Sequence, residues 1–242
     1  MPSYAIISDV HSNVEALNAV LKEIDKESVA ALFFLGDAVG YGSDPNTCTE
    51  LLRSVSNVFI AGNHDRGAVG LSDISFFNTY ARIAIDWTRD VLTDKNREFL
   101  TAVPLFRDVE EENIFLVHSS PKDPERWHYI EDKESAVKNF PYFQQTCCFV
   151  GHSHIPFIAE QSHNGKTVIF FTSAEIKEGC RYIINAGSVG QPRDGNPDAC
   201  YVILSSDVIK IKRVPYDILL AQKKMKDAGL PNYLITRLAK GK

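Results

Sequence analysis

Short apolar runs alternate with helical repeats in the N-terminal part of the chain. Three runs, at 4–8, 31–35 and 58–61, are bounded by turn residues and predict buried strands. Polar stretches with helical periodicity separate these runs. The order of strand, helix and strand is typical of a parallel sheet with helices packed against it.

Two helices are predicted between these strands. The apolar residues of the first recur at helical spacing and form one face: Val14, Leu17, Leu21 and Ile24. Ser12 and Glu15 have the spacing of a capping box, so we expect them to bond the first free amides of this helix. Asp44 followed by Pro45 predicts the start of a second, shorter helix.

The rest of the chain contains mostly strand-like segments. Residues 76–100 are predicted as one helix, with an apolar side made of Phe77, Ala81, Ile85, Thr88 and Leu92. Asn164-Gly165 lies between two apolar runs and predicts a tight hairpin. The other expected elements are strands at 105–109, 114–118, 147–150, 157–161, 168–172, 182–185, 201–204 and 208–212, and helices at 216–228 and 231–238.

These elements predict an α/β (α+β) fold in which two mixed sheets pack together with helices outside. The chain contains no repeat, low-complexity tract or Gly/Ser/Pro linker. We therefore expect a single domain over 1–242. It would include a helical insertion at about 71–104 and C-terminal helices at about 216–238.

Composition narrows the functional classes. The 242 residues carry a formal net charge of −5, which disfavours broad nucleic-acid binding because that requires a dense Lys/Arg surface. The net charge does not exclude a nucleotide as the substrate. We find no signal peptide and no apolar run of membrane-spanning length, so no membrane partner is expected. The five cysteines include no CxxC pair and favour reduced thiols in the cytoplasm.

Five short polar motifs follow predicted strands, where ligands bind in open α/β sheets. They are Asp9-x-His11, Gly36-Asp37, Gly62-Asn63-His64-Asp65, His118 and Gly151-His152-Ser153-His154. Taken alone, the Asp9-x-His11 motif is also consistent with an aspartate that caps a helix beside a surface histidine. The Gly36-Asp37 motif alone is also consistent with a turn. The paired histidines of the last motif are a more specific metal signal. Five of the seven histidines fall in these motifs, so their joint occurrence indicates a metal centre.

The ordered set of motifs resembles the calcineurin-like metallophosphoesterases. The similarity runs from Asp9 to about Arg193, and the segment 185–194 resembles the compact bacterial phosphodiesterase-like branch. Membership would imply a four-layer α/β/β/α sandwich. It would also imply two divalent cations (Mn, Fe, Zn or Ni, by the Asp/His/Asn donor set), with a small phosphate ester as substrate.

The resemblance assigns roles residue by residue. One metal would be held by Asp9, His11, Asp37 and His154. The second would be held by Asp37, Asn63, His118 and His152, with Asp37 bridging. His64 would be catalytic without binding metal. Phosphodiesters or monoesters, nucleotides among them, would be hydrolysed by a hydroxide bridging the two metals. The alternatives are a nuclease at the same site and a non-catalytic interaction module on the same fold.

Some positions depart from the family pattern. Protein Ser/Thr phosphatases carry GDxVDRG, whereas this chain has Gly40 and Tyr41 in place of the Asp and Arg. Because that Asp supports the catalytic histidine and that Arg binds phosphate, the change argues against a protein phosphatase and leaves open what orients His64. Two roles are open for Arg193: it binds a substrate phosphate, or it forms a salt bridge to Asp194. Trp127 suits packing of its loop better than stacking on a base.

Overall fold

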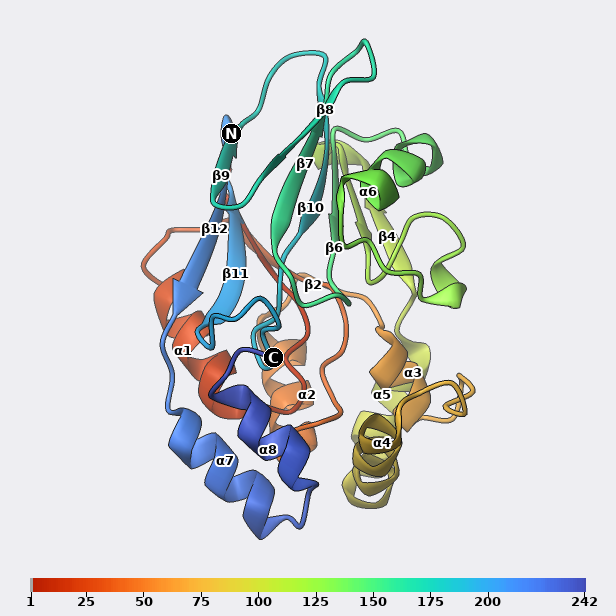
Figure 1. Ribbon diagram of the computed structural model, residues 1–242, viewed down its shortest axis with the longest axis vertical. Coiled ribbons are helices and arrows are strands. Elements are labelled where there is room, and N and C mark those ends of the chain that lie inside the picture. The colour runs from red at the N-terminus through yellow and green to blue at the C-terminus, as the bar shows by residue number, and fades with distance from the viewer. Residues whose placement is uncertain (1) are drawn as a thin grey trace.

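Two six-stranded sheets form the centre of the molecule in the computed structural model, which describes residues 2–242 (Figure 1). The first sheet has the order β3-β2-β1-β11-β12-β9. Its strands are β1 (Tyr4–Ile7), β2 (Ala31–Phe34), β3 (Val58–Phe59), β9 (Ser173–Glu175), β11 (Ala199–Leu204) and β12 (Val208–Val214). The three N-terminal strands are parallel, as the strand–helix–strand pattern predicts.

The second sheet has the order β4-β5-β6-β10-β7-β8. Its strands are β4 (Phe106–Val109), β5 (Ile114–Val117), β6 (Cys147–Val150), β7 (Phe157–Gln161), β8 (Thr167–Phe170) and β10 (Arg181–Asn185). Strands β5, β6 and β10 run parallel, and the others pair antiparallel. Both sheets are therefore mixed, which confirms the predicted fold class.

The α-helices lie outside the two sheets (Figure 1). They are α1 (Val14–Ile24), α2 (Pro45–Val55), α3 (Asn63–Ala68), α4 (Thr79–Val91), α5 (Asp94–Ala102), α6 (Lys133–Asn139), α7 (Ile218–Asp227) and α8 (Asn232–Leu238). Helix α1 packs on β11 and β12, whereas α6 packs on β7 and β8 (Figure 1). The layers are thus helix, sheet, sheet and helix.

The main core lies between the two sheets. Ile6 and Phe33 of the first sheet share one apolar cluster with Phe149 and Ile184 of the second. Each of these side chains is at most 3% exposed. This packing brings the ends of β1, β2 and β3 next to the ends of β5 and β6, and the five motifs follow these strands. None of the helices within residues 2–242 has the length and apolar character needed to span a bilayer.

Three local predictions need correction. Helix α1 is capped by Asn13, whose side chain accepts from the Ala16 amide at 3.1 Å, and the Ser12–Glu15 capping box is wrong. Ser12 has a φ of +55° and belongs to the preceding loop. Segment 76–100 is two helices, because Thr93 caps α5 and breaks the run. Strand β9 and helix α6 lie in segments for which no element is predicted.

Candidate metal centre

The structure brings all seven predicted metal ligands together. Asp9 and Asp37 follow β1 and β2, Asn63 begins α3, and the histidine motifs follow β5 and β6. All are at most 6% exposed: Asp9, His11, Asp37, Asn63, His118, His152 and His154. Three groups have ligand atoms close enough for one ion, namely Asp9–His11–His154, His11–Asp37–His64 and Asp37–His118–His152. The juxtaposition inferred from the motifs is therefore present.

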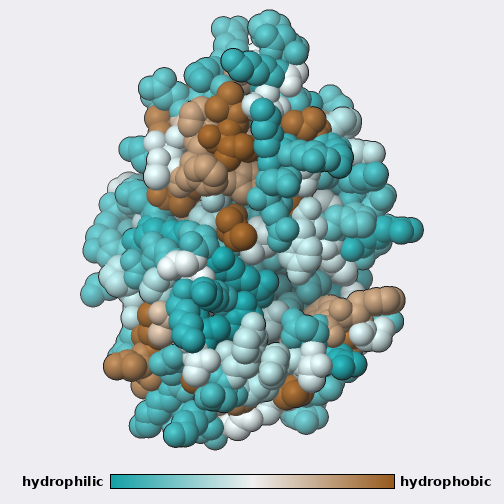
Figure 2. All heavy atoms as spheres, viewed as in Figure 1, coloured by the Kyte–Doolittle hydropathy of each residue, from teal (hydrophilic) through white to brown (hydrophobic). Residues whose placement is uncertain are grey.

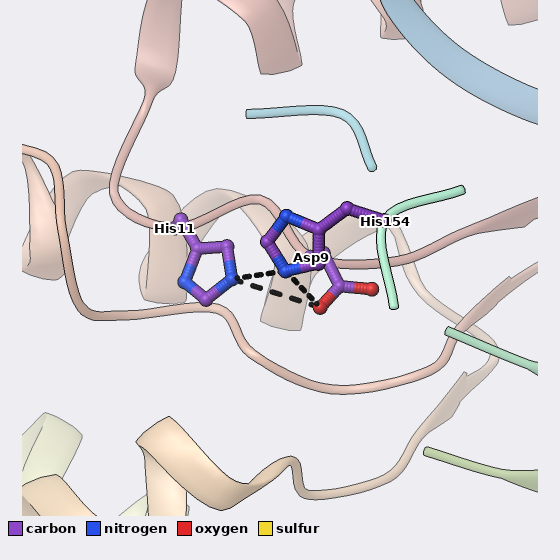
Figure 3. A group of neighbouring side chains, drawn as sticks. All are labelled: Asp9, His11 and His154. Carbon is purple, nitrogen blue, oxygen red and sulfur yellow. Dashed lines mark hydrogen bonds and ion pairs between the residues drawn. The ribbon is translucent and has the colours of Figure 1, made fainter. Parts of the chain in front are cut away.

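Asp9, His11 and His154 form one side of this centre (Figure 3). Oδ1 of Asp9 lies 3.1 Å from Nε2 of His154 and 3.6 Å from Nε2 of His11. This oxygen is buried and has no hydrogen-bond donor. The other oxygen, Oδ2, accepts from the amide of His152 at 3.0 Å. The carboxylate is thus anchored by one oxygen and presents the other to the site.

The histidines are oriented by backbone carbonyls. Nδ1 of His11, His118 and His154 lies 2.6–3.1 Å from the carbonyl oxygens of Val39, Leu35 and Gln191, respectively. Nε2 of His152 lies 3.0 Å from the carbonyl of Trp127. Because a carbonyl only accepts, each of these nitrogens must carry a proton. The other ring nitrogen of each neutral histidine is then a lone pair available to a metal.

This tautomer pattern is a direct test of whether the residues fit a cation. Nε2 of His11 and Nε2 of His154 lie only 3.1 Å apart. With both Nδ1 atoms protonated, the two Nε2 lone pairs face each other and cannot share a hydrogen bond. A cation in contact with both, and with Oδ1 of Asp9, would satisfy all three groups. The donor set therefore fits a divalent metal.

Asp37, Asn63 and His118 form the other side. Nε2 of His118 lies 3.4 Å from Oδ2 of Asp37 and 3.2 Å from Oδ1 of Asn63. The same Asp37 oxygen lies 3.6 Å from Nε2 of His11. Asp37 therefore lies between the two halves of the centre. Its second oxygen accepts from the amide of His64 at 2.8 Å, which keeps the carboxylate in one orientation.

Burial and neighbouring charge set the protonation of these groups. Burial alone would raise the pKa of Asp9, but His154, His11 and His118 outweigh it and hold that pKa well below its usual range. Burial lowers the pKa of His152 to about 3 and, with the charge of Arg193, that of His154 to about 4. At neutral pH these groups are an ionised carboxylate and two neutral imidazoles, which are the forms that bind metal.

His118 behaves differently from the other ligand histidines. Burial lowers its pKa, but Asp37 and Asp9 outweigh burial and raise the pKa to about 9. At neutral pH its Nε2 therefore holds a proton, which faces Oδ1 of Asn63 at 3.2 Å and Oδ2 of Asp37 at 3.4 Å. A metal must displace this proton in order to bind Nε2.

The loops that carry the ligands are strained. Five predicted ligands have φ values between +48° and +64°, a region that non-glycine residues rarely adopt: Asp9, His11, Asp37, His152 and His154. Such conformations cost on the order of 1–3 kcal/mol each and persist only where the surroundings enforce them. Here neighbouring backbone does so, since the amides of Asp9 and His11 bond the carbonyls of Gly36 and Asp37 at 3.0 and 2.9 Å.

Two motif glycines are required by close approach. A Cβ on Gly62 would lie 2.0 Å from Oδ1 of Asp37, and one on Gly151 would lie 2.0 Å from Oγ of Ser8. The Gly151 position would also crowd Asp9, at 2.4 Å from Oδ2. These contacts explain why glycine precedes both ligand motifs, because any side chain there would displace a carboxylate of the centre.

Asp65 has a structural role that was not assigned from the sequence. Its carboxylate accepts from the amides of Asp37 at 2.8 Å, Gly62 at 3.0 Å and Val39 at 3.2 Å. It therefore ties the loop after β2 to the start of α3. Burial, together with the charge of Asp37, raises the pKa of Asp65 to about 7. Its position at the end of the Gly-Asn-His-Asp motif was the available signal.

His64 is held by aromatic rings. Its ring centroid lies 4.4 Å from that of Tyr41, 4.8 Å from that of His11 and 5.1 Å from that of Phe77. Nδ1 is buried and has no hydrogen-bond partner. A Cβ on Gly40 would lie 2.3 Å from this nitrogen, so the glycine makes room for the ring. Packing therefore orients His64 in place of the carboxylate that protein phosphatases use.

Arg193 reaches the centre from the far end of the chain. Its guanidinium donates to Oε1 of Gln191 at 3.0 Å and to the Tyr41 hydroxyl at 3.3 Å, and it lies over the Tyr41 ring. Asp194 is paired with Arg213 instead, so the salt bridge considered for Arg193 is absent. Nε of Arg193 is buried without a partner. The cation is therefore available to an anion.

The centre opens into a pocket of about 850 Å³. Asp37, Asn63, His64 and His152 line its floor together with Arg193. Its wall includes the loop after β5, in which Trp127 is half-buried and presents its carbonyl to His152. The indole of Trp127 thus borders the pocket, and its backbone carbonyl orients His152, which is one of the predicted ligands. Carboxylates and imidazoles with converging lone pairs, beneath an arginine in an open pocket, define a metallophosphoesterase.

The comparisons with known proteins agree with this class. The model of the calcineurin-like phosphoesterase superfamily domain matches residues 3–207, and the chain belongs to that superfamily. A metallophosphoesterase from Sphaerobacter thermophilus has a crystal structure that is similar to this one, with a TM-score of 0.88 and 38% identity, covering 100% of this chain and 99% of that one.

Two curated relatives extend the similarity. The uncharacterised protein MJ0912 of Methanocaldococcus jannaschii is 42% identical over 98% of each chain. Phosphodiesterase YfcE of Escherichia coli is 27% identical over 89% of this chain and 94% of its own. The predicted family is thereby confirmed.

Proposed function

We propose that this protein hydrolyses phosphate monoesters or diesters at a centre of two divalent cations. One cation would be held by Asp9, His11, Asp37 and His154. The other would be held by Asp37, Asn63, His118 and His152. The single observation that carries the proposal is the pair of facing Nε2 lone pairs of His11 and His154, 3.1 Å apart beneath the pocket.

When bound, two such cations neutralise a phosphate ester and make hydroxide available near neutral pH. Asp37 suits the shared position, because one of its oxygens lies within 3.6 Å of His11 Nε2 and 3.4 Å of His118 Nε2. A donor set of Asp, His and Asn favours Mn, Fe, Zn or Ni over Ca or Mg.

His64 is proposed as the catalytic residue that does not bind metal. Burial lowers its pKa well below the usual value, so its imidazole is neutral at neutral pH. Nδ1 faces only packed side chains, which leaves the proton on Nε2. The ring can then donate a hydrogen bond from Nε2 to a phosphoryl or leaving oxygen. A neutral His64 is therefore proposed to stabilise the charge that develops on the oxygen, rather than to act as a charged imidazolium that donates a proton.

Arg193 is proposed to bind the substrate phosphate. It lines the pocket, and its Nε has no hydrogen-bond partner among residues 2–242. Tyr41 holds the guanidinium by a hydrogen bond and by its ring. In the protein phosphatases of this superfamily the position of Tyr41 is an arginine. Here Arg193, from the chain segment after β10, would provide the equivalent charge.

The test is to measure metal content together with hydrolysis of bis(p-nitrophenyl) phosphate and p-nitrophenyl phosphate. The wild type, supplied with Mn²⁺, Fe²⁺, Zn²⁺ or Ni²⁺ in turn, is expected to bind two equivalents and to turn over at least one ester. His154→Ala should lose metal and activity. His163→Ala is the matched control, because His163 is an exposed histidine on the β7–β8 hairpin. Full metal content in His154→Ala, or an inactive metal-loaded wild type, would contradict the proposal.

A further inference from the structure

Two loops of different origin form the rim of the pocket. One is the α3–α4 loop, residues 69–78, which contributes Phe76 to the lining and forms an apolar projection at the right-hand edge of Figure 2. The other is the loop after β5, which includes the 3-10 helix η2 (Pro124–Arg126) and contributes Trp127 and Tyr129. Both lie on the right-hand side of the molecule (Figure 1). The loop after β5 contacts a predicted metal ligand, His152, at two points.

Tyr129 covers one face of that ligand. Its ring is stacked on the imidazole of His152, with the ring centroids 4.1 Å apart and the planes inclined by 12°. The edge of the same imidazole is held by the carbonyl of Trp127, which lies 3.0 Å from Nε2. The carbonyl fixes one atom of the ring, whereas the stacked phenol fixes its plane. Two residues of one loop therefore set the direction of the other ring nitrogen of His152, Nδ1.

The segment that carries Tyr129 is anchored on both sides. Before it, Trp127 has a φ of +55° and is held by its carbonyl contact to His152. After it, Ile130 is 2% exposed and belongs to an apolar cluster with Val117 and Val150. These two valines are the last residues of β5 and β6. Tyr129 is thus fixed to the ends of the strands that precede the histidine ligands.

The hydroxyl of Tyr129 is directed into the pocket. The side chain lines the pocket and is 50% exposed. Partial burial raises the pKa of Tyr129, and the charged groups that act on this pKa include Arg193, which lowers it, and Asp37, which raises it. The phenol oxygen therefore lies near both the arginine and the central carboxylate. It makes no hydrogen bond to another residue within the described part of the chain, so it is free to bond a ligand.

We infer that Tyr129 has two roles at this site: its ring holds the plane of His152, and its hydroxyl donates a hydrogen bond to an oxygen of the substrate phosphate. The inference rests on the proposed function for the place of that phosphate. A phenol is a neutral donor, so its contact would add to the charge of Arg193 without a second cation. The groups that contact the phosphate would then come from two remote loops, one after β10 and one after β5.

The role of the ring is tested by metal affinity, measured by calorimetry with Mn²⁺. Tyr129→Phe keeps the ring and should bind both equivalents as wild type does, within about twofold. Tyr129→Leu should weaken one of the two equivalents by about 3- to 10-fold, because His152 would serve only one cation. Tyr142→Leu is the matched control, because Tyr142 is 48% exposed and does not line the pocket. Normal affinity in Tyr129→Leu, or an equal loss in Tyr129→Phe, would overturn the role of the ring.

The role of the hydroxyl is tested by calorimetry with inorganic phosphate on the Mn²⁺-loaded protein. Tyr129→Phe should bind phosphate about 3- to 10-fold more weakly than wild type, whereas Tyr142→Phe should not differ from wild type. In hydrolysis the same loss should appear mainly in KM. Unchanged phosphate affinity in Tyr129→Phe would overturn the role of the hydroxyl. Both binding arms are decisive even where no ester is turned over, and failure of the proposed function is seen separately in the hydrolysis assays.

Discussion

The floor and the rim of the pocket differ in how their side chains are held. On the floor, the histidines proposed as ligands bond backbone carbonyls, and the seven proposed ligand side chains are at most 6% exposed. On the rim, Phe76 is 90% exposed, Tyr129 is 50% exposed, and Arg126 has no ion pair within the described residues. The groups proposed to carry out the reaction are thus held in place within the protein itself. Groups on the rim are more exposed, although the Tyr129 ring also stacks on His152 with centroids 4.1 Å apart.

This contrast has an energetic reason. A cation centre needs lone pairs placed to within a fraction of an ångström, and burial with backbone hydrogen bonds provides that order. The strained φ values of the ligand residues are part of its cost. The parts of a substrate that lie away from the metals need a surface that can be desolvated, so the side chains that contact them must be exposed beforehand. Substitutions on the floor should therefore abolish the reaction, whereas those on the rim should change affinity.

The largest effect is expected for Asp37→Asn. Asp37 lies between His11 and His118 and would serve both cations, so the neutral amide should reduce metal content and transition-state stabilisation together. Several kcal/mol of such stabilisation corresponds to a loss of kcat/KM on the order of 10⁴-fold. The measurement is metal content and hydrolysis of bis(p-nitrophenyl) phosphate in parallel. Near-normal values of both would remove Asp37 from the centre.

His64→Ala should come next, with a loss in kcat of about 10²–10³-fold on an ester with a poor leaving group. Both metals should remain bound, because the carbonyl-oriented histidines are untouched. The effect should shrink on p-nitrophenyl esters, whose leaving group needs less stabilisation. Loss of metal from this variant would show that His64 is a ligand instead.

Arg193→Gln should lower kcat/KM by about 10- to 100-fold, since a hydrogen bond to a charged group contributes about 1.5–3 kcal/mol. Tyr41→Phe keeps the ring that packs on His64 but removes the hydroxyl partner of Arg193, so a loss of only a few-fold is expected. Steady-state kinetics on one diester suffice for both. If Tyr41→Phe were the more damaging of the two, Arg193 would not be the phosphate-binding group.

A pH dependence of metal affinity is also expected. The pKa of His118 is raised to about 9, so its proton is bound in the metal-free centre at lower pH and must leave when metal binds. Affinity should therefore rise with pH, by up to about tenfold per unit for this one proton, and level off near pH 9. Competition with a chelator between pH 6.5 and 9.5 measures it. A constant affinity would mean that His118 is already neutral.

Much of the fold was predictable because it depends on local periodicity. The runs at 4–8, 31–35 and 147–150 become buried strands, since their apolar residues have no polar face to expose. The break between α4 and α5 was missed because Thr93 caps a helix within an otherwise helical pattern. Helix α6 carries few apolar residues, so periodicity gave little sign of it.

The members of the centre were recognisable because their residue types follow strand ends in a fixed order. The surroundings of these residues were not predictable from the sequence. The hydrogen bond from Arg193 to Tyr41 joins residues that are 152 positions apart in the chain. The contact between the Trp127 carbonyl and His152 joins residues that are 25 positions apart. Both depend on how these chain segments meet in space. The support of His64 by rings in place of a carboxylate is likewise a property of packing, since Gly40 shows only that a side chain is missing.

The amino-acid sequence by itself determined which groups could carry the chemistry, because strand periodicity and the order of Asp, Asn, His and Gly are written along the chain. Only the tertiary structure decided how those groups are protonated, oriented and approached. Tautomers and pKa values depend on which carbonyls, charges and rings surround a buried group. Those neighbours come from remote segments that the packing of two sheets brings to one edge.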